Sequence, residues 1–592
     1  MTTARATGRP AGQPWFALVV GTCVIVALVA TSLVAGAGGS APWSWASVAT
    51  QALLLATVAT SWNIVGGYLG HIDLAHVAYF GVGAYGTGVT ETMLGWGLPA
   101  SLVAGACLAA ATATVAGSAI LRLHGLSFAI ATLGLLVLFR EGVRLAGPLT
   151  GGGRGLVLPP VSAAVVYYAA VMLFAVAVMV SWRLRHTSLW PVVLAVREDE
   201  QGAAVRGVRT TPWKHTIYTA AALITGTAGG LWAYQSTFID PDLAFADARS
   251  LDMITATLLG GVGTVIGPII GSLILFAGRA YLGPPSDAAQ MLLQGLVLIG
   301  IVRWLPRGIV GWLTGWWKFP AALARPRGGA SASQPAPPAR SSEARPFGDC
   351  VLEVRGLSTP DSGTTVLEGI DLCARSGEIL GLIGPNGSGK TTLVDCLCRL
   401  RPIDNGTIRL SGQDVTRHSA PRLVRAGLGR TFQVRRVYRQ LTVADNLLLC
   451  THWTMASVGR RPPAAVEGRV SDLLSHLELS PLADTLAGDL SAGQQRLLEI
   501  GMALMRDPQV LLLDEATAGV PPSLVTTVKA VVRSCADQGM AVVVVEHDVG
   551  VVADLCHRVV VLDRGQIVAE GTPASVMASG VIETAYIGAT EG

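Results

Sequence analysis

The chain has 592 residues, of which 51% are hydrophobic and only 14% charged, and its mean hydropathy is +0.51. Soluble chains carry about 25% charged residues, so this composition excludes an ordinary soluble protein and predicts extensive contact with membrane lipid. The net charge of +4 and the absence of a basic stripe interleaved with aromatic residues argue against nucleic acid as a partner.

Long apolar runs dominate residues 1–317, which we predict to be a transmembrane domain. Trp15–Ala37 is long enough to cross a bilayer, which takes about 20 residues, and it exceeds the apolar core of a signal peptide. We therefore expect an uncleaved membrane helix there. The further candidate spans are Ser44–Val65, Asp73–Met93, Leu98–Ile120, Gly125–Phe139, Val161–Trp182, Trp213–Ser236, Leu251–Ala277 and Ala288–Val302.

Arginine placement predicts the topology of these spans. Arg183–Lys214 is rich in arginine, and by the positive-inside rule it is cytoplasmic, as is the N-terminus with Arg5 and Arg9. Leu251–Ala277 is interrupted at Gly260–Gly263 and at Gly267–Pro268, so we expect it either to cross twice as short pieces or to re-enter the membrane. The total is then roughly 8–10 spans.

The composition changes after the last span. Residues 318–349 are predicted to be a flexible linker, because Arg325–Arg345 is rich in Pro, Ala, Ser, Gly and Arg and lacks apolar periodicity. Residues 350–592 are predicted to be a soluble domain. The nine cysteines of the chain show no zinc spacing, and we expect small core residues rather than a disulfide framework.

A Gly-rich loop lies between a predicted strand, Glu378–Ile383, and a helix expected from Leu393 onward. It matches G-x-x-x-x-G-K-[ST], in which backbone N–H groups and a helix N-terminus converge on phosphate oxygens. The lysine is expected to reach the outer phosphates of ATP, and the Thr391 hydroxyl to bind Mg²⁺. The predicted ATP-binding residues are Gly384, Pro385, Asn386, Gly387, Ser388, Gly389, Lys390, Thr391 and Thr392.

A second apolar strand, Val510–Leu513, ends in two acids. We expect Asp514 to bind Mg²⁺ and Glu515 to polarise the attacking water. Two acids after a strand would equally suit a helix N-cap, but their place downstream of a phosphate loop favours nucleotide hydrolysis. The predicted cofactors are ATP and Mg²⁺. The predicted fold class is an all-α polytopic membrane domain followed by an α/β P-loop NTPase domain.

Three further motifs make residues 350–592 resemble the nucleotide-binding domain of ABC transporters. Leu490–Gln495 matches the family signature, Gln433 fits the Q-loop glutamine, and His547 fits the switch histidine. The resemblance implies two cassettes arranged head to tail, with each ATP between one phosphate loop and the other cassette's signature. It implies that Gln433 completes the magnesium shell and that His547 acts with Glu515. The signature residues expected at a partner's ATP are Ser491, Ala492, Gly493 and Gln494.

Two stretches depart from the family pattern. Ser358–Gly363 lacks the aromatic residue that the family stacks on adenine, although Val366 can supply an apolar face. Ala518–Pro522 lacks the Asp or Asn common in that loop. These departures concern adenine affinity and communication across the cassette dimer.

A finer resemblance is to the branched-chain (hydrophobic) amino acid ABC importers. Thr431–Gln433, Leu441–Leu447 and Val545–Asp548 are similar to their ATPase, LivG. Within roughly residues 45–305 the chain is similar to their permease, LivM. The similar permease stretches are Trp62–Gly70, Leu74–Tyr85, Phe128–Leu133, Leu149–Gly152 and Ala195–Glu200.

Two groups of polar residues in the membrane domain are functional candidates. The Arg183–Lys214 loop is the longest polar stretch between spans, and Glu198–Val208 can form a short helix that docks on a cassette, with a solvated loop as the alternative. The predicted coupling residues are Glu198, Ala203, Ala204 and Gly207. Ionisable residues inside a membrane default to a functional hypothesis, with an interfacial position as the alternative. The candidate translocation-path residues are His71, Asp73 and His76, whose spacing is not that of a strong metal site.

The predicted function is that of a permease and ATPase fused in one ABC importer subunit of the plasma membrane, with the N-terminus and ATPase domain cytoplasmic. The resemblance implies branched-chain or related amino acids as cargo, while relatives carry urea, short amides or small carboxylates. The implied partners are a second permease subunit, a second ATPase subunit, an extracytoplasmic substrate-binding protein and membrane lipid. An exporter half-transporter is the alternative, but the short linked spans favour import.

Overall fold

The computed structural model describes residues 44–74, 76–187, 189–282, 287–316, 347–359, 366–451 and 463–580. The chain divides into two units, one formed by Met1–Trp190 with Thr211–Ala321 and the other by Pro191–Thr210 with Ala322–Gly592. We call them the membrane unit and the cassette unit. The predicted span Trp15–Ala37 and the Arg325–Arg345 segment lie outside the described residues.

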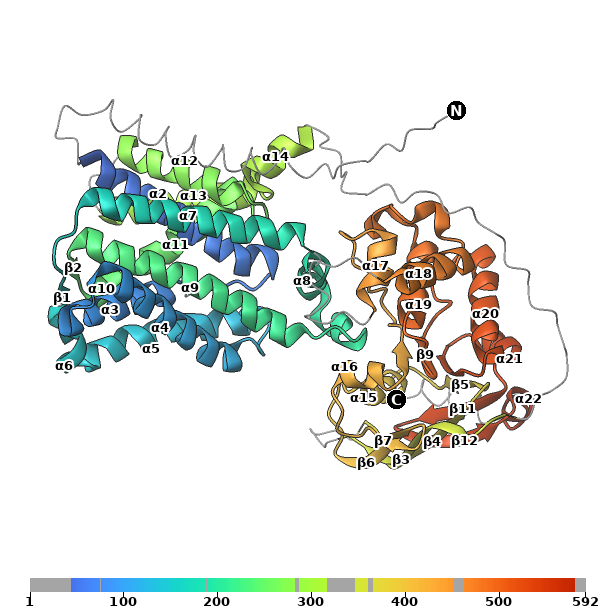
Figure 1. Cartoon of the computed structure of the whole chain (residues 1–592). Coiled ribbons are helices and arrows are strands. Elements are labelled where there is room, and N and C mark those ends of the chain that lie inside the picture. Colours follow the sequence, from blue (N-terminus) through green and yellow to red (C-terminus); the bar gives the residue numbers. More distant parts are fainter. Residues whose placement is uncertain are drawn as a thin grey trace, which may run out of the picture. The chain divides into compact units, whose positions relative to one another are not determined.

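The membrane unit is built from helices rich in apolar and small residues (Figure 1). Its main helices are α2 (Ser44–Trp62), α3 (His76–Leu94), α4 (Gly97–Ile120), α5 (Leu126–Leu145), α7 (Ala163–His186), α9 (Thr210–Ser236), α11 (Asp247–Gly260), α12 (Gly267–Leu282), α13 (Asp287–Trp304) and α14 (Gly308–Trp316). Its shorter helical elements are η1 (Asn63–Tyr68), α6 (Gly147–Thr150), η2 (Gly152–Arg154) and α10 (Pro241–Ala244). Sequence reasoning missed a two-stranded antiparallel pair, β1 (Leu156–Val157) with β2 (Phe238–Ile239).

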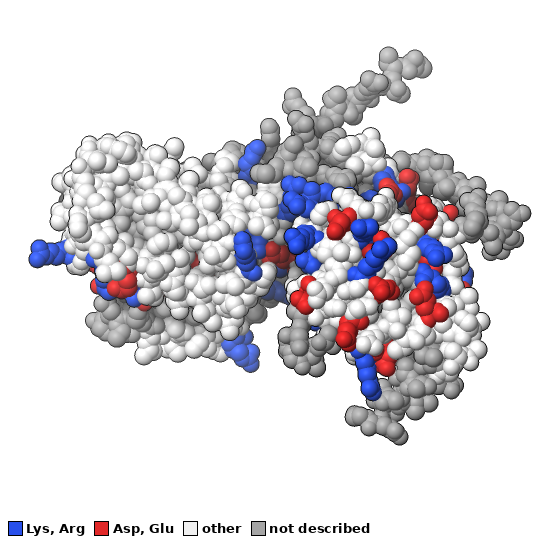
Figure 2. Space-filling view, turned by 90° about the horizontal axis from the view of Figure 1, so that it is seen from below, with Lys and Arg blue, Asp and Glu red and all other residues white. Residues whose placement is uncertain are grey.

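Several of these helices can cross a bilayer. Among the described residues, five helical stretches are long and apolar enough: Ala46–Tyr68, Gly97–Ile120, Leu126–Leu145, Ala163–His186 and Leu292–Leu313. The face of this unit visible in Figure 2 is almost free of charged side chains. Large apolar side chains such as Val115, Leu126 and Leu145 are exposed, as lipid contact requires. The total number of spans stays a prediction.

The expected interruption of Leu251–Ala277 is present. Helix α11 ends at Gly260 and α12 begins at Gly267, with Gly261 at φ +132° between them. A Cβ on Gly260 would lie 1.6 Å from the carbonyl oxygen of Gly267, so only glycine permits this approach. Asn63 holds the turn, because its amide nitrogen donates to the Thr264 carbonyl at 2.9 Å and its oxygen accepts from Gly263 N–H at 2.8 Å.

Small residues bring the membrane helices into close contact. A Cβ on Gly83 in α3 would lie 2.1 Å from the carbonyl oxygen of Gly226 in α9. Where no side chain intervenes, backbones approach closely and gain dispersion contacts. Large aromatic side chains fill the remaining interior, including the fully buried Tyr79 and Tyr218.

The cassette unit contains two sheets. The larger has six strands in the order β12-β11-β5-β10-β9-β8, in which only the β11–β12 pair is antiparallel. The smaller is antiparallel in the order β4-β3-β6-β7. The strands are β3 (Cys350–Ser358), β4 (Ile370–Arg375), β5 (Ile379–Ile383), β6 (Asn405–Leu410), β7 (Gln413–Asp414), β8 (Leu428–Arg430), β9 (Val510–Asp514), β10 (Ala541–Val545), β11 (Arg558–Asp563) and β12 (Gln566–Gly571).

The central strands β5, β9 and β10 are buried along their whole length, which explains their continuous apolar sequences. Helices accompany the sheets in the α/β arrangement predicted for this part of the chain. They are α15 (Lys390–Leu397), α16 (Ala420–Arg425), α17 (Val443–Leu449), α18 (Ala464–His476), α19 (Ala492–Leu504), α20 (Pro522–Asp537), α21 (Val549–Leu555) and α22 (Pro573–Ala578), with short η4 (Ser480–Leu482) and η5 (Ala487–Asp489).

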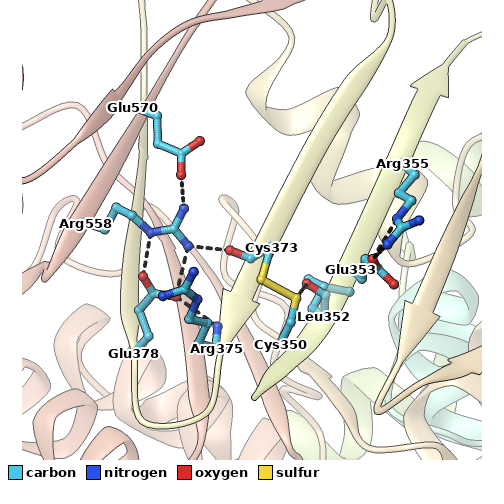
Figure 3. The surroundings of a disulfide bond; sticks show 9 residues. All are labelled: Cys350, Leu352, Glu353, Arg355, Cys373, Arg375, Glu378, Arg558 and Glu570. Carbon is cyan, nitrogen blue, oxygen red and sulfur yellow. Dashed lines mark hydrogen bonds and ion pairs between the residues drawn. A yellow bond between two sulfur atoms is a disulfide. The ribbon is translucent and has the colours of Figure 1, made fainter. Parts of the chain in front are cut away.

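The expectation that the cysteines are small core residues is wrong for Cys107, which is exposed, and for one pair that forms a disulfide. Cys350 in β3 and Cys373 in β4 form a disulfide across neighbouring strands, with Cα atoms 5.9 Å apart (Figure 3). Their places in the sequence carry no signal of pairing, because only strand register brings them together. Beside the bond, Arg558 donates to Glu378, Glu570 and the carbonyl of Cys373.

Candidate functional site

The predicted phosphate loop connects β5 to α15. Gly384 has φ +152°, and a Cβ there would lie 2.0 Å from the Leu562 carbonyl oxygen, so the loop requires glycine at this position. Lys390 donates through Nζ to the carbonyl oxygens of Gly384 at 2.7 Å and Pro385 at 2.8 Å. Burial lowers the pKa of Lys390, and the nearby Glu515 and Asp514 oppose that effect. Lys390 thus contacts the beginning of the loop with which it is predicted to bind phosphate.

Asp514 ends β9 with a side chain that is 1% exposed. In the part of the chain that is described, neither of its carboxylate oxygens accepts a hydrogen bond, and Arg430 Nη2 lies 3.7 Å from Oδ2. Burial raises the pKa of Asp514 to about 6, while Arg430 lowers it. A buried carboxylate with open lone pairs is a hard oxygen ligand of the type that Mg²⁺ prefers. Thr391 is exposed, and the chemistry of its hydroxyl and of the Asp514 carboxylate fits a magnesium site.

Glu515 is the point where three predicted residues meet. Its Oε1 accepts from Gln433 Nε2 at 3.0 Å and lies 2.8 Å from His547 Nε2. Gln433, Glu515 and His547 follow β8, β9 and β10, and these parallel neighbours end at the same edge of the sheet. Glu515 has φ +49°, a strained conformation for a residue with a Cβ and one that is typical of functional sites.

The signature residues begin helix α19. Ser491 caps this helix, because its Oγ accepts from Gln494 N–H at 3.3 Å while Gln494 Oε1 accepts from Ser491 N–H at 3.0 Å. Ser491 and Ala492 are exposed, whereas Gly493 is buried. A Cβ on Gly493 would lie 2.3 Å from a methyl carbon of Leu524. The exposed turn is available to another molecule, and its contact with a partner's ATP stays a prediction.

The two departures from the family pattern lie beside this site. Of Ser358–Gly363, residues 360–363 lie outside the described part. Val366 lies next to the phosphate loop, because a Cβ on Gly389 would lie 3.1 Å from the Val366 carbonyl oxygen. Ala518–Pro522 follows β9 and leads into α20. The expected effects on adenine affinity and on communication across the cassette dimer stay predictions.

The predicted coupling segment belongs to the cassette unit, although it lies between α7 and α9 in the sequence. Its helix α8 (Trp190–Val205) is interrupted at Asp199, whose φ of −159° is not helical. Glu198 accepts N–H bonds from Arg439 at 2.7 Å and Gln440 at 3.3 Å, and Asp199 pairs with Arg436 at 3.1 Å. Burial raises the pKa of Glu198, and the two N–H donors lower it.

The C-terminal half of this segment packs closely on the cassette. Ala203 is fully buried, Ala204 is half-buried, and Gly207 has φ +84°. A Cβ on Gly207 would lie 2.8 Å from Cζ of Arg506, which explains the glycine. The segment is therefore docked rather than a solvated loop.

The candidate path residues are all buried in the membrane unit, and two of them, Asp73 and His76, contact each other. Asp73 and His76 are fully buried, with Oδ2 and Nδ1 3.1 Å apart, and His76 Nε2 lies 2.8 Å from Thr225 Oγ1. His71 Nδ1 lies 3.1 Å from the Leu69 carbonyl oxygen. In the described ranges, no group of three or more His, Cys, Asp or Glu is placed to hold a metal ion. The role of these residues in translocation stays a prediction.

Sequence reasoning missed several buried charges around the sheet edge that carries Gln433, Glu515 and His547, which we call the catalytic edge. Arg430, Arg496 and Glu499 are almost inaccessible to solvent, as is Arg206 in the coupling segment. A signal existed for two of them, since Arg496 and Glu499 stand three residues apart within an apolar stretch of α19. Charged residues on a buried helix face are rare unless they are paired.

Comparisons with known proteins place both parts of the chain. The profile of the family described as "ABC transporter" matches residues 367–518, and that of "Branched-chain amino acid transport system / permease component" matches residues 44–302. An uncharacterised ABC transporter ATP-binding protein of Rhizobium meliloti is 35% identical over 40% of this chain and 87% of its own length. The high-affinity branched-chain amino acid transport ATP-binding protein BraF of Pseudomonas aeruginosa is 31% identical over 40% of this chain and 98% of its own length. The lipopolysaccharide export system ATP-binding protein LptB of Escherichia coli is 32% identical over 40% and 97%, respectively.

Proposed function

Because this chain belongs to the ABC transporters and joins a permease domain to an ATP-hydrolysing cassette, we propose that it is a LivM-like permease fused to a LivG-like ATPase. In this proposal it imports branched-chain or related amino acids across the plasma membrane. The observation that supports the substrate class most is the match of residues 44–302 to a branched-chain amino acid permease, in one chain with a cassette similar to BraF. Urea, short amides and small carboxylates are the alternative cargo.

The division of labour in the chain follows from this proposal. Residues 1–317 form the permease domain, 318–349 the linker and 350–592 the ATPase domain. The N-terminus and the ATPase domain face the cytoplasm. Within the permease sequence, Glu198, Ala203, Ala204 and Gly207 form the element that couples the two activities, which the docking of Pro191–Thr210 in the cassette unit supports.

Each catalytic residue has a proposed task in ATP hydrolysis. Lys390 and the loop Gly384–Thr392 bind the phosphates, and Thr391, Gln433 and Asp514 hold Mg²⁺. The ion supplies charge stabilisation to the phosphates. Glu515 orients and polarises the attacking water and is itself held by Gln433 and His547, which the distances of 3.0 and 2.8 Å support.

The complete transporter requires more than one chain. Residues Ser491–Gln494 serve ATP on another cassette, so the proposed partners are a second ATPase subunit, a second permease subunit and an extracytoplasmic substrate-binding protein. The exposed Ser491 turn supports this arrangement.

An exporter is the second candidate. The cassette is 32% identical to LptB, an export system protein, and 31% identical to BraF, so the cassette alone does not favour import. The match of the permease sequence to an amino acid transport component favours import over an exporter half-transporter.

A vesicle assay tests direction and substrate together. The assembled transporter is reconstituted with ATP on the cassette side, and the movement of labelled leucine, isoleucine, valine, urea and acetate is followed. ATP-dependent movement of the branched-chain amino acids toward the cassette side is expected, and Glu515→Gln serves as the inactive control. Movement of all probes away from the cassette side, or of urea or acetate alone, would contradict the proposal.

The same assay tests the proposed path residues. Changing His71 and His76 to Ala should reduce transport, because both are buried polar residues of the membrane unit. Unchanged transport would exclude them from the path.

A further inference from the structure

One buried carboxylate in the cassette unit connects the coupling segment with the catalytic edge. Glu499 lies in α19 and is 0% exposed. Its Oε1 accepts N–H bonds from Phe432 at 3.1 Å and Arg436 at 3.4 Å. These residues flank Gln433, so Glu499 holds the loop on both sides of the glutamine that contacts Glu515.

Arg496 extends this connection to the end of β9. Its Nη1 donates to Glu499 Oε2 at 2.7 Å and to the Phe432 carbonyl at 2.6 Å. Its other nitrogen atoms donate to the carbonyls of Asp514 at 2.9 Å, Glu515 and Ala516. A guanidinium has five N–H donors in a rigid fork, so a single side chain orients all these groups at once.

A second arginine approaches the same carboxylate from the coupling segment. Arg206 is 2% exposed by its side chain, and its Nη2 lies 3.7 Å from Glu499 Oε1. It also donates to the Tyr438 hydroxyl at 3.3 Å and to the Arg436 carbonyl. Its guanidinium carbon lies 5.2 Å from the Tyr438 ring centre and 5.8 Å from that of Phe432.

The charges of the buried side chains explain why the contact of Arg206 with Glu499 affects the Gln433 loop. A buried arginine needs an opposite charge, and Asp199 is engaged by Arg436. Glu499 is therefore the carboxylate that compensates Arg206, and it already serves Arg496 and two backbone N–H groups. A displacement of Arg206 changes the balance of attractions on a carboxylate that holds the Gln433 loop.

We propose that Arg206 is a positioning residue for ATP hydrolysis, which acts through Glu499 on the Gln433 loop and, through Arg496, on the segment that carries Asp514 and Glu515. The inference rests on the proposed coupling role of the Pro191–Thr210 segment and names the contact through which that segment controls the ATPase. In the described part of the chain, Arg206 contacts neither the phosphate loop nor Lys390, so it sets the turnover rate rather than ATP affinity.

The test is a mutant cycle on the full chain in the assembled transporter, with Mg·ATP as the only ligand. Arg206→Met should lower kcat for ATP hydrolysis roughly tenfold, the effect of an interaction lost in the reacting state, with KM for ATP unchanged. Arg206→Lys should recover most of the rate because it restores the charge. The double variant Arg206→Met/Glu499→Gln should be no slower than Glu499→Gln alone, since the two residues act as one unit.

Arg533→Met is the matched control, because Arg533 is a half-exposed cassette arginine paired with Asp554. Its kcat should equal that of the parent chain. If Arg206→Met does not fold, Arg206→Gln replaces it, since the amide keeps hydrogen bonding to Tyr438 without the charge. Unchanged kcat, a rise in KM without a fall in kcat, or multiplicative effects in the double variant would overturn the inference.

The outcome is separable from that of the vesicle assay, because no transported substrate is present. A kcat effect in a transporter that does not move amino acids leaves the inference intact and refutes the proposed cargo. Amino acid transport with no kcat effect of Arg206→Met supports the proposed cargo and refutes the inference.

Discussion

Replacing Asp514 by Asn should make the nucleotide-free cassette more stable while abolishing Mg²⁺-dependent ATP hydrolysis. Burial raises the pKa of Asp514 from 3.8 to about 6. A raised carboxyl pKa means that the folded protein binds the proton more tightly than the unfolded chain does. Ionisation of Asp514 therefore destabilises the folded state. This destabilisation is absent below pH 3.8, grows as the pH rises and is complete above pH 6.

The magnitude follows from the rise of the Asp514 pKa from 3.8 to about 6. At about 1.4 kcal/mol per unit the ionised carboxylate costs the folded state about 3 kcal/mol at pH 8. The Asn amide removes the charge but leaves a buried polar group, which costs about 1–2 kcal/mol. The net gain of about 1–2 kcal/mol corresponds to a rise in Tm of about 2–8 °C for a domain of this size.

Calorimetry of the full chain without Mg²⁺ and nucleotide measures this gain. Tryptophan fluorescence is unsuitable, because all tryptophans of the chain except Trp453 precede residue 318. The advantage of Asp514→Asn should shrink by about 1–2 kcal/mol between pH 8 and pH 5, as the parent carboxylate takes up its proton. Asp554→Asn is the control, since the pKa of exposed Asp554 is lowered by Lys529 and Arg533 and its loss should not stabilise. A variant that melts below the parent at pH 8, with a gap independent of pH, would refute the reasoning.

Three further predictions concern the catalytic base, the coupling segment and the disulfide. Glu515→Gln should lower ATP hydrolysis by about 100-fold or more and trap bound ATP, measured by steady-state turnover and retention of labelled ATP; retained hydrolysis would exclude Glu515 as the base. Gly207→Val should reduce the amount of substrate transported per ATP hydrolysed, because a side chain there meets Arg506 and the left-handed backbone costs a residue with a Cβ about 1–2 kcal/mol. Arg209→Ala, at an exposed position nearby, should leave this ratio unchanged. Peptide mapping without reductant should find Cys350 joined to Cys373, and reduction should lower the cassette Tm, since closing a 23-residue separation contributes up to about 3 kcal/mol; unpaired thiols in oxidised protein would contradict this.

Much of the cassette was predictable because its signals are local. The apolar runs before Gly384 and Asp514 predict the buried strands β5 and β9, and both are present. Parallel strands then bring their carboxyl ends to one edge, where Gln433 and His547, which the family resemblance associates with Glu515, contact it. The break in Leu251–Ala277 was predictable for the same reason, since glycines mark it in the sequence.

Other features depend on contacts between distant segments. The pairing of Cys350 with Cys373 follows from the register of β3 and β4, and the missed strand pair joins Leu156 to Ile239. Neither feature has a periodic signal in the sequence. Each depends on which distant segments pair, and the local conformational preference of a segment does not determine its pairing partner.

The sequence by itself determined the two parts of this protein and its family resemblance, and it predicted the hydrolytic residues, since hydropathy and short motifs are written along the chain. Only the tertiary structure decided that Pro191–Thr210 packs with the cassette and that Arg206 meets Glu499 inside it. An arginine in a polar loop between membrane helices is expected to be in water. Its burial becomes favourable only when a carboxylate 293 positions later in the chain lies within 3.7 Å, and no local pattern encodes that meeting.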